Sequence, residues 1–456
     1  MTARAQWAHA HPLIGRPVAP RRAASASARL NIDGLITALL LLATVLMCTV
    51  SSSLLGVLKI HYATLGGAAY EKLHPATYVL ILTFMLSLFR NGDPIAEIDR
   101  FFGRANLILI YLICTLALLA QSLAQQRPFA VIMDTFLLPL LFAVIAWRTP
   151  PRQRWALVWA VHATVFINVC LAYYEYFSGH RIVPLMLGDN VMMGEWRATA
   201  LLGHPLAASS FIGAYIIALM LRPSLIPWPA LRFPFILFCL GSLACFGGRT
   251  AMILVALTIV GLGIVRGFGL LRGERVSLPV ILIAFVAVFT ILALVLVAFD
   301  SGLFDKAMLR FSSDKGSAAT RLASLKLLGF FGWSELILGP DPARARSLQS
   351  LMGLDLGIEN FWVSSIVQFG IASTALITLG LGCFFAEVLR RSHPAAWALV
   401  LFIVVVAASS VSFSSKNTYL AQYVALIAIL LPRAKTETAG SHVRPMRAGH
   451  IRLPAR

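Results

Sequence analysis

The strongest constraint on the fold is a series of apolar runs, several of about 18 residues or more, separated mostly by short polar connections. Runs of this length cross a bilayer as helices, because the backbone must satisfy its own hydrogen bonds inside lipid. The chain is 59% hydrophobic and 12% charged, whereas about a quarter of the residues in a soluble domain are charged. The sequence therefore predicts an all-α, polytopic membrane helical bundle.

About twelve spans are predicted, joined to one long polar loop between the ninth and the tenth. Their approximate ranges are 35–58, 76–89, 105–123, 129–147, 155–177, 205–221, 233–247, 250–265, 279–299, 361–388, 395–411 and 417–431. The second, seventh and eighth runs are short for a membrane crossing.

The net charge of +19 is explained by the orientation of the spans in the membrane. In a soluble protein such an excess would suggest nucleic acid, but here the basic residues lie in short loops and at both ends, so no nucleic-acid partner is expected. The connections predicted inside carry thirteen arginines, and both predicted inner tails are basic as well: Arg90, Arg100, Arg104, Arg148, Arg152, Arg154, Arg222, Arg232, Arg266, Arg272, Arg275, Arg390 and Arg391 lie in the connections. The positive-inside rule then places both termini in the cytoplasm and the long loop on the far face of the membrane.

The polar stretch from Asp300 to Asn360 is long enough to form a separate unit, and a long loop is exempt from the positive-inside rule. The chain is accordingly divided into a disordered basic cytoplasmic tail (1–31), spans one to nine (32–299), a periplasmic loop domain (300–360), spans ten to twelve (361–431) and a second basic cytoplasmic tail (432–456). The loop domain is expected to cover a polar site between the helices.

The six cysteines all fall within apolar runs and show no metal-ligand spacing, so no metal site is expected. The sequence also lacks a Walker A motif and a Gly-x-Ser-x-Gly nucleophile elbow. Apart from Asp134 and Glu175, acids are nearly absent from the spans, which argues against a proton-coupled relay.

Arg249 is the sharpest candidate site residue. It follows Gly247 and Gly248 between the seventh and eighth spans, where almost no linker separates two helices. An arginine at membrane depth costs a few kcal/mol unless it is paired or hydrated, so it usually faces a cavity. The alternative is an interfacial side chain that reaches lipid phosphate.

Arg321 opens a segment that ends in aromatic residues at Trp333 and suits a helix lying along the membrane interface. In the functional interpretation Arg321 and Lys326 hold substrate phosphate, and in the structural one both are solvated lipid anchors. The outer connection 178–204 adds Arg197 as a possible substrate contact.

Two polar positions open predicted helices. His204 precedes Pro205, where it can bind an anion or cap the helix. Glu359 and Asn360 precede the tenth span, where an acid is stabilised by the helix dipole or acts as a general base.

Four features together resemble the O-antigen ligase and polymerase superfamily of bacterial membrane glycosyltransferases, including its exopolysaccharide branch. One is the count of about twelve spans with a long outer loop after the ninth. The others are motifs: Leu202-Gly203-His204-Pro205-Leu206, similar to the family's Gly-x-Pro-Asn turn; Gly247-Gly248-Arg249-Thr250-Ala251, similar to its Ser-Arg-(Gly/Thr)-Ala; and Arg321 through Pro340, similar to its Arg…Trp…Pro…Gly loop pattern. Ligases of this family typically place a His, often before Asn, where this chain has Glu359-Asn360, which favours a polymerase or the exopolysaccharide branch.

The resemblance implies transfer of a glycan from an undecaprenyl-diphosphate-linked saccharide to the hydroxyl of an acceptor glycan, outside the cytoplasm and without a cofactor. Arg249 and Arg321 would stabilise the departing diphosphate, because fixed guanidinium groups suit developing phosphate charge. Glu359 would orient or deprotonate the acceptor, with His204, Asn360, Arg197 and Lys326 as substrate contacts. Membrane lipids and other polysaccharide assembly proteins are the remaining expected partners.

Three alternatives remain: an O-antigen ligase acting on lipid A-core, a lipid-linked saccharide flippase or other exporter, and a non-catalytic assembly scaffold. A flippase is expected to show cationic residues through its core and pseudo-symmetric halves.

Overall fold

The computed structural model describes residues 24–64, 66–103, 105–187, 190–192, 196–226, 229–273, 317–355, 357–409 and 415–433. The predicted ninth span (279–299) and residues 300–316 of the long loop lie outside these ranges. In the first half of the chain the helices are α1 (Ala24–Thr49), α2 (Ser52–Val57), η1 (Ala69–Lys72), α3 (Pro75–Leu88), α4 (Pro94–Phe102), α5 (Asn106–Ala124), α6 (Ala130–Ile132), η2 (Met133–Leu137), α7 (Leu138–Arg148), α8 (Pro151–Ser178), η3 (Ala200–Leu202) and α9 (Pro205–Leu221). The second half contains η4 (Pro223–Leu225), α10 (Pro229–Phe246), α11 (Arg249–Leu271), α14 (Ser317–Leu328), α15 (Trp333–Leu338), α16 (Pro342–Leu351), α17 (Phe361–Phe369), α18 (Ile371–Arg391), α19 (Ala396–Ser409) and α20 (Tyr419–Leu430).

The described residues form a helical membrane protein. Six helical stretches are long and apolar enough to cross a bilayer, within α1, α5, the run from α6 to α7, α8, α11 and α18, and five shorter apolar helices accompany them. The strands in these ranges are β1 (Met186–Leu187) and β2 (Asn190–Val191), which pair antiparallel with Met186 opposite Val191. The predicted all-α class is thus confirmed.

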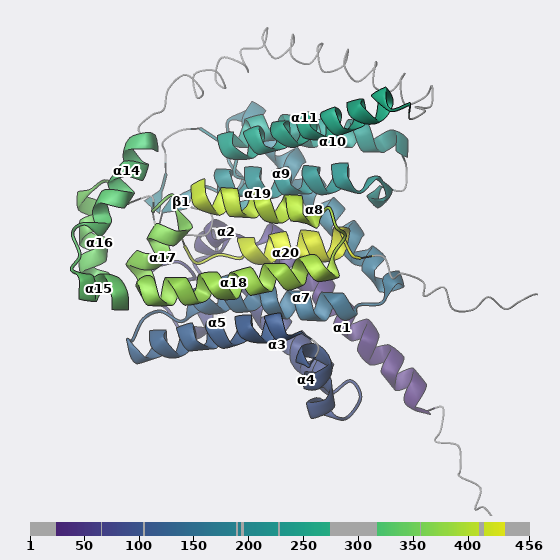
Figure 1. Ribbon diagram of the computed structural model, residues 1–456, viewed down its shortest axis with the longest axis horizontal. Coiled ribbons are helices and arrows are strands. Elements are labelled where there is room, and N and C mark those ends of the chain that lie inside the picture. Colours follow the sequence, from purple (N-terminus) through teal and green to yellow (C-terminus); the bar gives the residue numbers. More distant parts are fainter. Residues whose placement is uncertain are drawn as a thin grey trace, which may run out of the picture.

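The centre of the bundle is made of helices that are apolar on every side. Every residue of α20 from Leu420 to Leu430 is buried, and α7 and α9 are buried along almost their whole length. A helix that is apolar all round requires protein or lipid on all its faces. The long helices run side by side (Figure 1), and α5 and α18 pack closely, with the Tyr111 and Phe384 rings stacked 4.6 Å apart.

A cap lies at one end of this bundle. We define the cap as α14, α15, α16 and α17, which group together on the left in Figure 1. It has a small apolar core of its own, separate from that of the bundle: Leu327, Phe331, Ala345, Leu354, Ile358, Val363 and Val367. The end of the bundle that carries the cap is called the cap end below.

The predicted tenth span, 361–388, is two helices. Gly370 has a φ of 88° and separates α17 from α18. Val363 and Val367 of α17 join the core of the cap, whereas Phe361 and Phe369 join the core of the bundle. The sequence did not indicate this break, because both faces of α17 are buried and its residues continue the apolar run of α18.

The structure also differs from the sequence analysis at the N-terminus. α1 begins at Ala24, inside the stretch 1–31 that was expected to be a disordered tail. Ala and Arg are strong helix formers, so the alanine-rich segment before the first span extends that helix.

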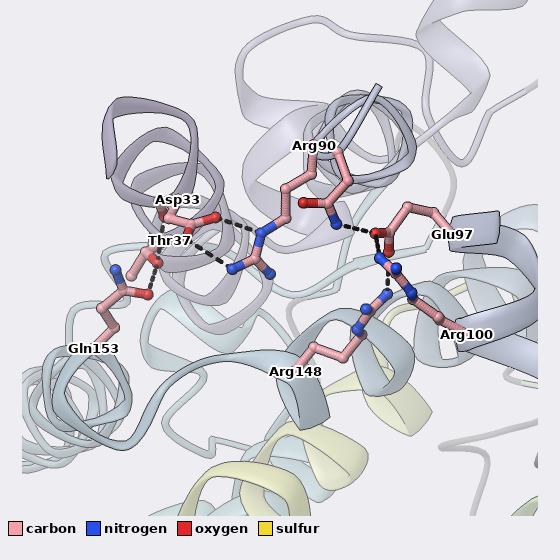
Figure 2. A network of polar contacts seen from close by, with 8 residues as sticks. Asp33, Thr37, Arg90, Glu97, Arg100, Arg148 and Gln153 are labelled. Carbon is pink, nitrogen blue, oxygen red and sulfur yellow. Dashed lines mark hydrogen bonds and ion pairs between the residues drawn. The ribbon is translucent and has the colours of Figure 1, made fainter. Parts of the chain in front are cut away.

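The end of the bundle opposite the cap is tied together by charged side chains (Figure 2). Asp33 of α1 pairs with Arg90, with 2.7 Å between Oδ1 and Nε. Glu97 of α4 is fully buried and pairs with Arg148 at the end of α7, with 2.7 Å between Oε2 and Nη1. Arg100 and Asn91 also donate to Glu97. These contacts fix α4 against the end of α7.

Candidate functional site

An ion pair within the cap links α14 to the residues just before α17. The Nε of Arg321, on α14, lies 3.4 Å from Oε2 of Glu359, just before α17. Arg321 Nη2 lies 3.5 Å from the carbonyl oxygen of Ser409, the last residue of α19. The Arg321 side chain is 52% exposed. A guanidinium has five N–H donors, so this group can hold Glu359 and still bind an anion.

Asn360 caps α17 and also links it to the bundle. Its Oδ1 accepts hydrogen bonds from the backbone N–H groups of Trp362 (3.0 Å) and Val363 (3.1 Å). Its Nδ2 donates to the carbonyl oxygen of Ala408 in the last turn of α19, at 3.2 Å. Both polar atoms of the amide are therefore used in positioning, and the neighbouring Glu359 is held beside the end of α19.

Arg249 begins α11 at the same end of the bundle. The preceding Gly248 lies against Ser209 of α9, where an added Cβ would be less than 3.0 Å from the serine side chain. Further along, Gly213 of α9 contacts Phe402 of α19 and Val255 of α11, so these three helices pack together. Arg249 therefore lies next to the first turns of α9, on the side of α19 that packs against α9 and α11.

His204 precedes α9 and does not cap it with a side-chain hydrogen bond. Its Nδ1 is buried and has no hydrogen-bond partner among the residues that the structure describes. Burial, together with the positive charge of nearby Arg197, lowers the pKa of His204 to about 4. The imidazole is therefore neutral at pH 7 in the absence of a ligand, and a hydrogen bond to a ligand is the chemistry that this neutral ring offers.

Arg197 belongs to the same region as His204. The next residue, Ala198, donates from its N–H to the carbonyl oxygen of Cys245 at 3.1 Å, which places this segment against the end of α10, close to Gly247 and Gly248. Arg197 and His204 consequently lie near the start of α11. The structure brings together Arg321, Glu359 and Asn360 as one group and Arg197 with His204 as another, both at the cap end.

Lys326 is the candidate that the structure separates from the others. It is exposed on α14, five residues after Arg321. Residues five apart differ by about 140° around a helix, so the two side chains project from different faces. Lys326 is therefore not part of the Arg321–Glu359 group.

Glu175 anchors the connection that carries Arg197 and His204. Its carboxylate is fully buried near the end of α8 and accepts hydrogen bonds from the N–H groups of Ile182 (2.8 Å), Thr199 (2.7 Å) and Ala200 (3.0 Å). The sequence analysis counted this acid only as one of the few acids within the spans. Its anchoring role was indicated by its position, because a lone carboxylate near the end of an apolar run directly precedes an irregular connection.

Asp134 does the same for residues 58–74. It lies in the π-helical turn η2 and accepts from the Tyr62 hydroxyl (2.8 Å), the Thr77 hydroxyl (2.6 Å) and the His74 N–H (3.1 Å to Oδ2). Lys416 Nζ lies 3.7 Å from the Tyr62 ring centroid and donates to the Lys72 carbonyl at 3.0 Å. Asp134 and Glu175 therefore hold cap-end connections in place.

Arg127 fastens the cap to the bundle. Its guanidinium follows α5 and donates to the carbonyl oxygens of Gly339 and Pro340, both at 3.0 Å, and of Gln368 at the end of α17. Gln125 donates to the carbonyl oxygen of Leu338 at 3.3 Å. The sequence analysis did not single out Arg127.

Within the described ranges, no group of three or more His, Cys, Asp or Glu side chains is placed to hold a metal ion. No protein-family model matches the chain, and no curated protein matches it. Inference about function therefore depends on the chemistry of the cap-end residues: guanidinium groups for anionic charge, one carboxylate and one neutral imidazole.

Proposed function

We propose that the chain is a bacterial inner-membrane glycosyltransferase of polysaccharide biosynthesis. It transfers a saccharide from undecaprenyl diphosphate to an acceptor hydroxyl on the non-cytoplasmic face. The preferred reaction is polymerisation of the repeat units of an exopolysaccharide or O-antigen. The proposal includes twelve spans, two cytoplasmic termini and a cap in the periplasm. The observation that carries it is the pairing of Arg321 with Glu359 where the cap meets the bundle.

In the proposed reaction, the acceptor oxygen forms a bond to the anomeric carbon while the bond from that carbon to the diphosphate breaks. The electron pair stays on the leaving diphosphate, whose charge Arg321 and Arg249 stabilise. Glu359 accepts a hydrogen bond from the acceptor hydroxyl and takes its proton as the new bond forms. Asn360 is a positioning residue, because its amide holds Glu359 beside α19.

The half-exposed Arg321 supports this assignment. A guanidinium that is fully enclosed by protein acceptors cannot take up a ligand, but this one is open to solvent and bound to only part of a carboxylate. His204, near the start of α11, supplies a neutral hydrogen-bonding group at the same end of the bundle.

The test uses purified protein in proteoliposomes with a labelled undecaprenyl-diphosphate saccharide. We expect Arg321→Ala and Arg249→Ala each to lower polymer formation roughly 100-fold or more, because removal of a single preorganised donor to developing charge has that effect. Arg321→Lys should restore only part of the activity, since an ammonium lacks the bidentate geometry. Arg346→Ala is the matched control, because Arg346 is an exposed cap arginine that donates to Pro342 of its own helix.

Unchanged polymer in both alanine variants would reject the site. Movement of labelled lipid across the vesicle membrane without a new glycosidic bond would instead indicate a flippase. Surface glycans of a deletion strain separate the two transferase reactions: loss of a polymerase leaves single repeat units, and loss of a ligase leaves long chains on the carrier.

A further inference from the structure

Two short helices at opposite ends of α5 expose apolar side chains. At one end, α4 presents Ile95, which is 80% exposed, and Ile98. At the other, α15 presents Trp333, which is 77% exposed, together with Ile337 and Leu338. Figure 1 shows α4 and α15 near opposite ends of α5.

α4 combines a buried carboxylate with exposed isoleucines. Glu97 is fully buried and pairs with Arg148 (Figure 2), whereas Ile95 and Ile98 are exposed beside the charged residues Asp99 and Arg100. Burying a charge while exposing isoleucine to water is unfavourable on both counts. The arrangement is stable where the outward face of the helix meets lipid instead of water.

On α15 the carboxylate also faces the protein, although it is only partly buried. Glu335 pairs with Arg344 of α16, on the side of the cap, and its side chain is 29% exposed. Leu338 lies beside the end of α5, where Gln125 donates to its carbonyl oxygen. Tryptophan is enriched at membrane–water boundaries because its ring is apolar and its N–H is polar. Trp333 is placed as a boundary residue of this kind.

The length of α5, the helix between them, matches the thickness of a bilayer. α5 has 19 residues, a length of about 28 Å at 1.5 Å per residue, and the hydrocarbon core of a bilayer is about 30 Å thick. An apolar stripe is exposed along the helix and joins the two ends: Leu109, Ile110, Ile113, Leu116 and Leu123. The exposed faces of α4 and α15 are therefore continuous with a lipid-facing surface of matching length.

We propose that α4 and α15 are interfacial helices that seat the protein in the bilayer, α4 at one leaflet surface and α15 at the other. The partner is the lipid surface itself: acyl chains near the headgroups contact Ile95 and Ile98 on one side and Trp333, Ile337 and Leu338 on the other. The Glu97–Arg148 pair and the Arg127 hydrogen bonds hold the two helices at these depths. This assignment does not depend on the proposed chemistry.

The test compares the depths of spin labels in nanodiscs of phosphatidylcholine and phosphatidylglycerol. Four single-cysteine additions are made: Ile98→Cys on α4, Leu338→Cys on α15, Ile113→Cys in the middle of α5 and Arg346→Cys on the exposed side of α16. Four native cysteines, Cys48, Cys114, Cys239 and Cys245, are buried, and Cys170 and Cys383 are replaced with alanine in the parent. Collision rates with oxygen and with a water-soluble nickel chelate report the depth of each label.

The labels at 98 and 338 should both lie between those at 113 and 346, within about 10 Å of the hydrocarbon boundary. A label at either position with the nickel accessibility of position 346, or with the depth of position 113, would overturn the proposal. Dipolar broadening between labels at 98 or 338 on different molecules would show that a second copy covers the face, and would also overturn it.

Discussion

At the scale of single residues, the buried acids are satisfied by protein donors. Glu175 meets three backbone N–H groups and Asp134 meets two hydroxyls and a backbone N–H. A buried charge is tolerated only when such hydrogen bonds replace water. The candidate site residues differ, because Arg321 is half-exposed and His204 keeps a buried nitrogen without a partner in the described part of the chain.

His74 gives a prediction about pH. Burial lowers the pKa of His74 to about 4. The hydrogen bond with the Val50 carbonyl opposes this shift, and the positive charge of Lys416 adds to it. Its Nδ1 accepts from the Ala76 N–H at 3.1 Å, so the folded state holds the neutral ring. Between pH 6.5 and 4 the unfolded chain binds the extra proton, so the stabilisation present above pH 6.5 is lost as the pH falls, by at most about 3 kcal/mol.

Thermal unfolding in detergent between pH 7 and pH 4 measures this effect. His74→Gln keeps a polar side chain but does not titrate, so its melting temperature should fall less steeply over that interval. His204 also titrates with a pKa of about 4, and the difference between wild type and variant isolates His74. Parallel curves for the two proteins would contradict the assignment.

The sequence predicted which residue types matter at the cap end but not which of them meet. Arg321 lies on α14, whereas Glu359 and Asn360 lie together just before α17, and the packing of α14 against α17 brings Arg321 to Glu359. Arg321 and Asn360 both also contact the end of α19. The helix period alone places Lys326 and Arg321 on different faces, since residues five positions apart do not share a face. Arg127 could not be identified, because its three acceptors are backbone carbonyls more than 200 residues away.

At the scale of elements, the break between α17 and α18 decides how the cap sits on the bundle. A Cβ at Gly370 would lie less than 3.0 Å from backbone atoms of Ile337, Leu338 and Gly339. The backbone also has a positive φ of 88°, which a residue with a Cβ adopts at a cost. Hydrophobicity alone could not reveal this, because the run from 361 to 388 is apolar throughout.

We therefore expect Gly370→Ala to destabilise the protein by roughly 1–3 kcal/mol or more. Gly382→Ala is the matched control: Gly382 lies within α18 and has no neighbouring atom within 4 Å of an added Cβ, so its substitution should be neutral or stabilising. Melting temperatures of the two variants in the same detergent provide the comparison. Equal values would show that the approach of α15 to Gly370 is not restrictive.

Arg127 carries a second prediction at this scale. Arg127→Ala leaves the carbonyl oxygens of Gly339, Pro340 and Gln368 without these donors, so local opening of the cap should become easier by about 1–3 kcal/mol. Hydrogen exchange should accelerate in residues 333–355 while the core helix α20 keeps its protection. Arg346→Ala is the control, and uniform acceleration across the whole protein would contradict a local clamp.

At the scale of the whole molecule, hydrophobic length was sufficient to predict a helical membrane bundle, because lipid permits few other folds. It was not sufficient for the details at helix ends, where α1 starts earlier than predicted and the tenth run divides. The distribution of arginines carries the remaining prediction, which is orientation. The described residues place α4 and the cap near opposite ends of α5 (Figure 1).

Thiol labelling from one side of the membrane tests that orientation. Ser347→Cys is exposed on α16 of the cap and Asp99→Cys is exposed on α4. The positive-inside rule puts Arg90, Arg100 and Arg148 in the cytoplasm, so an impermeant maleimide added to intact spheroplasts should label position 347 and reach position 99 only after permeabilisation. Wild-type protein gives the background of the native thiols. The reversed pattern would place the Arg321–Glu359 pair in the cytoplasm, where the proposed transfer to a periplasmic acceptor cannot occur, and labelling of both positions from one side would mean that α5 does not cross the bilayer.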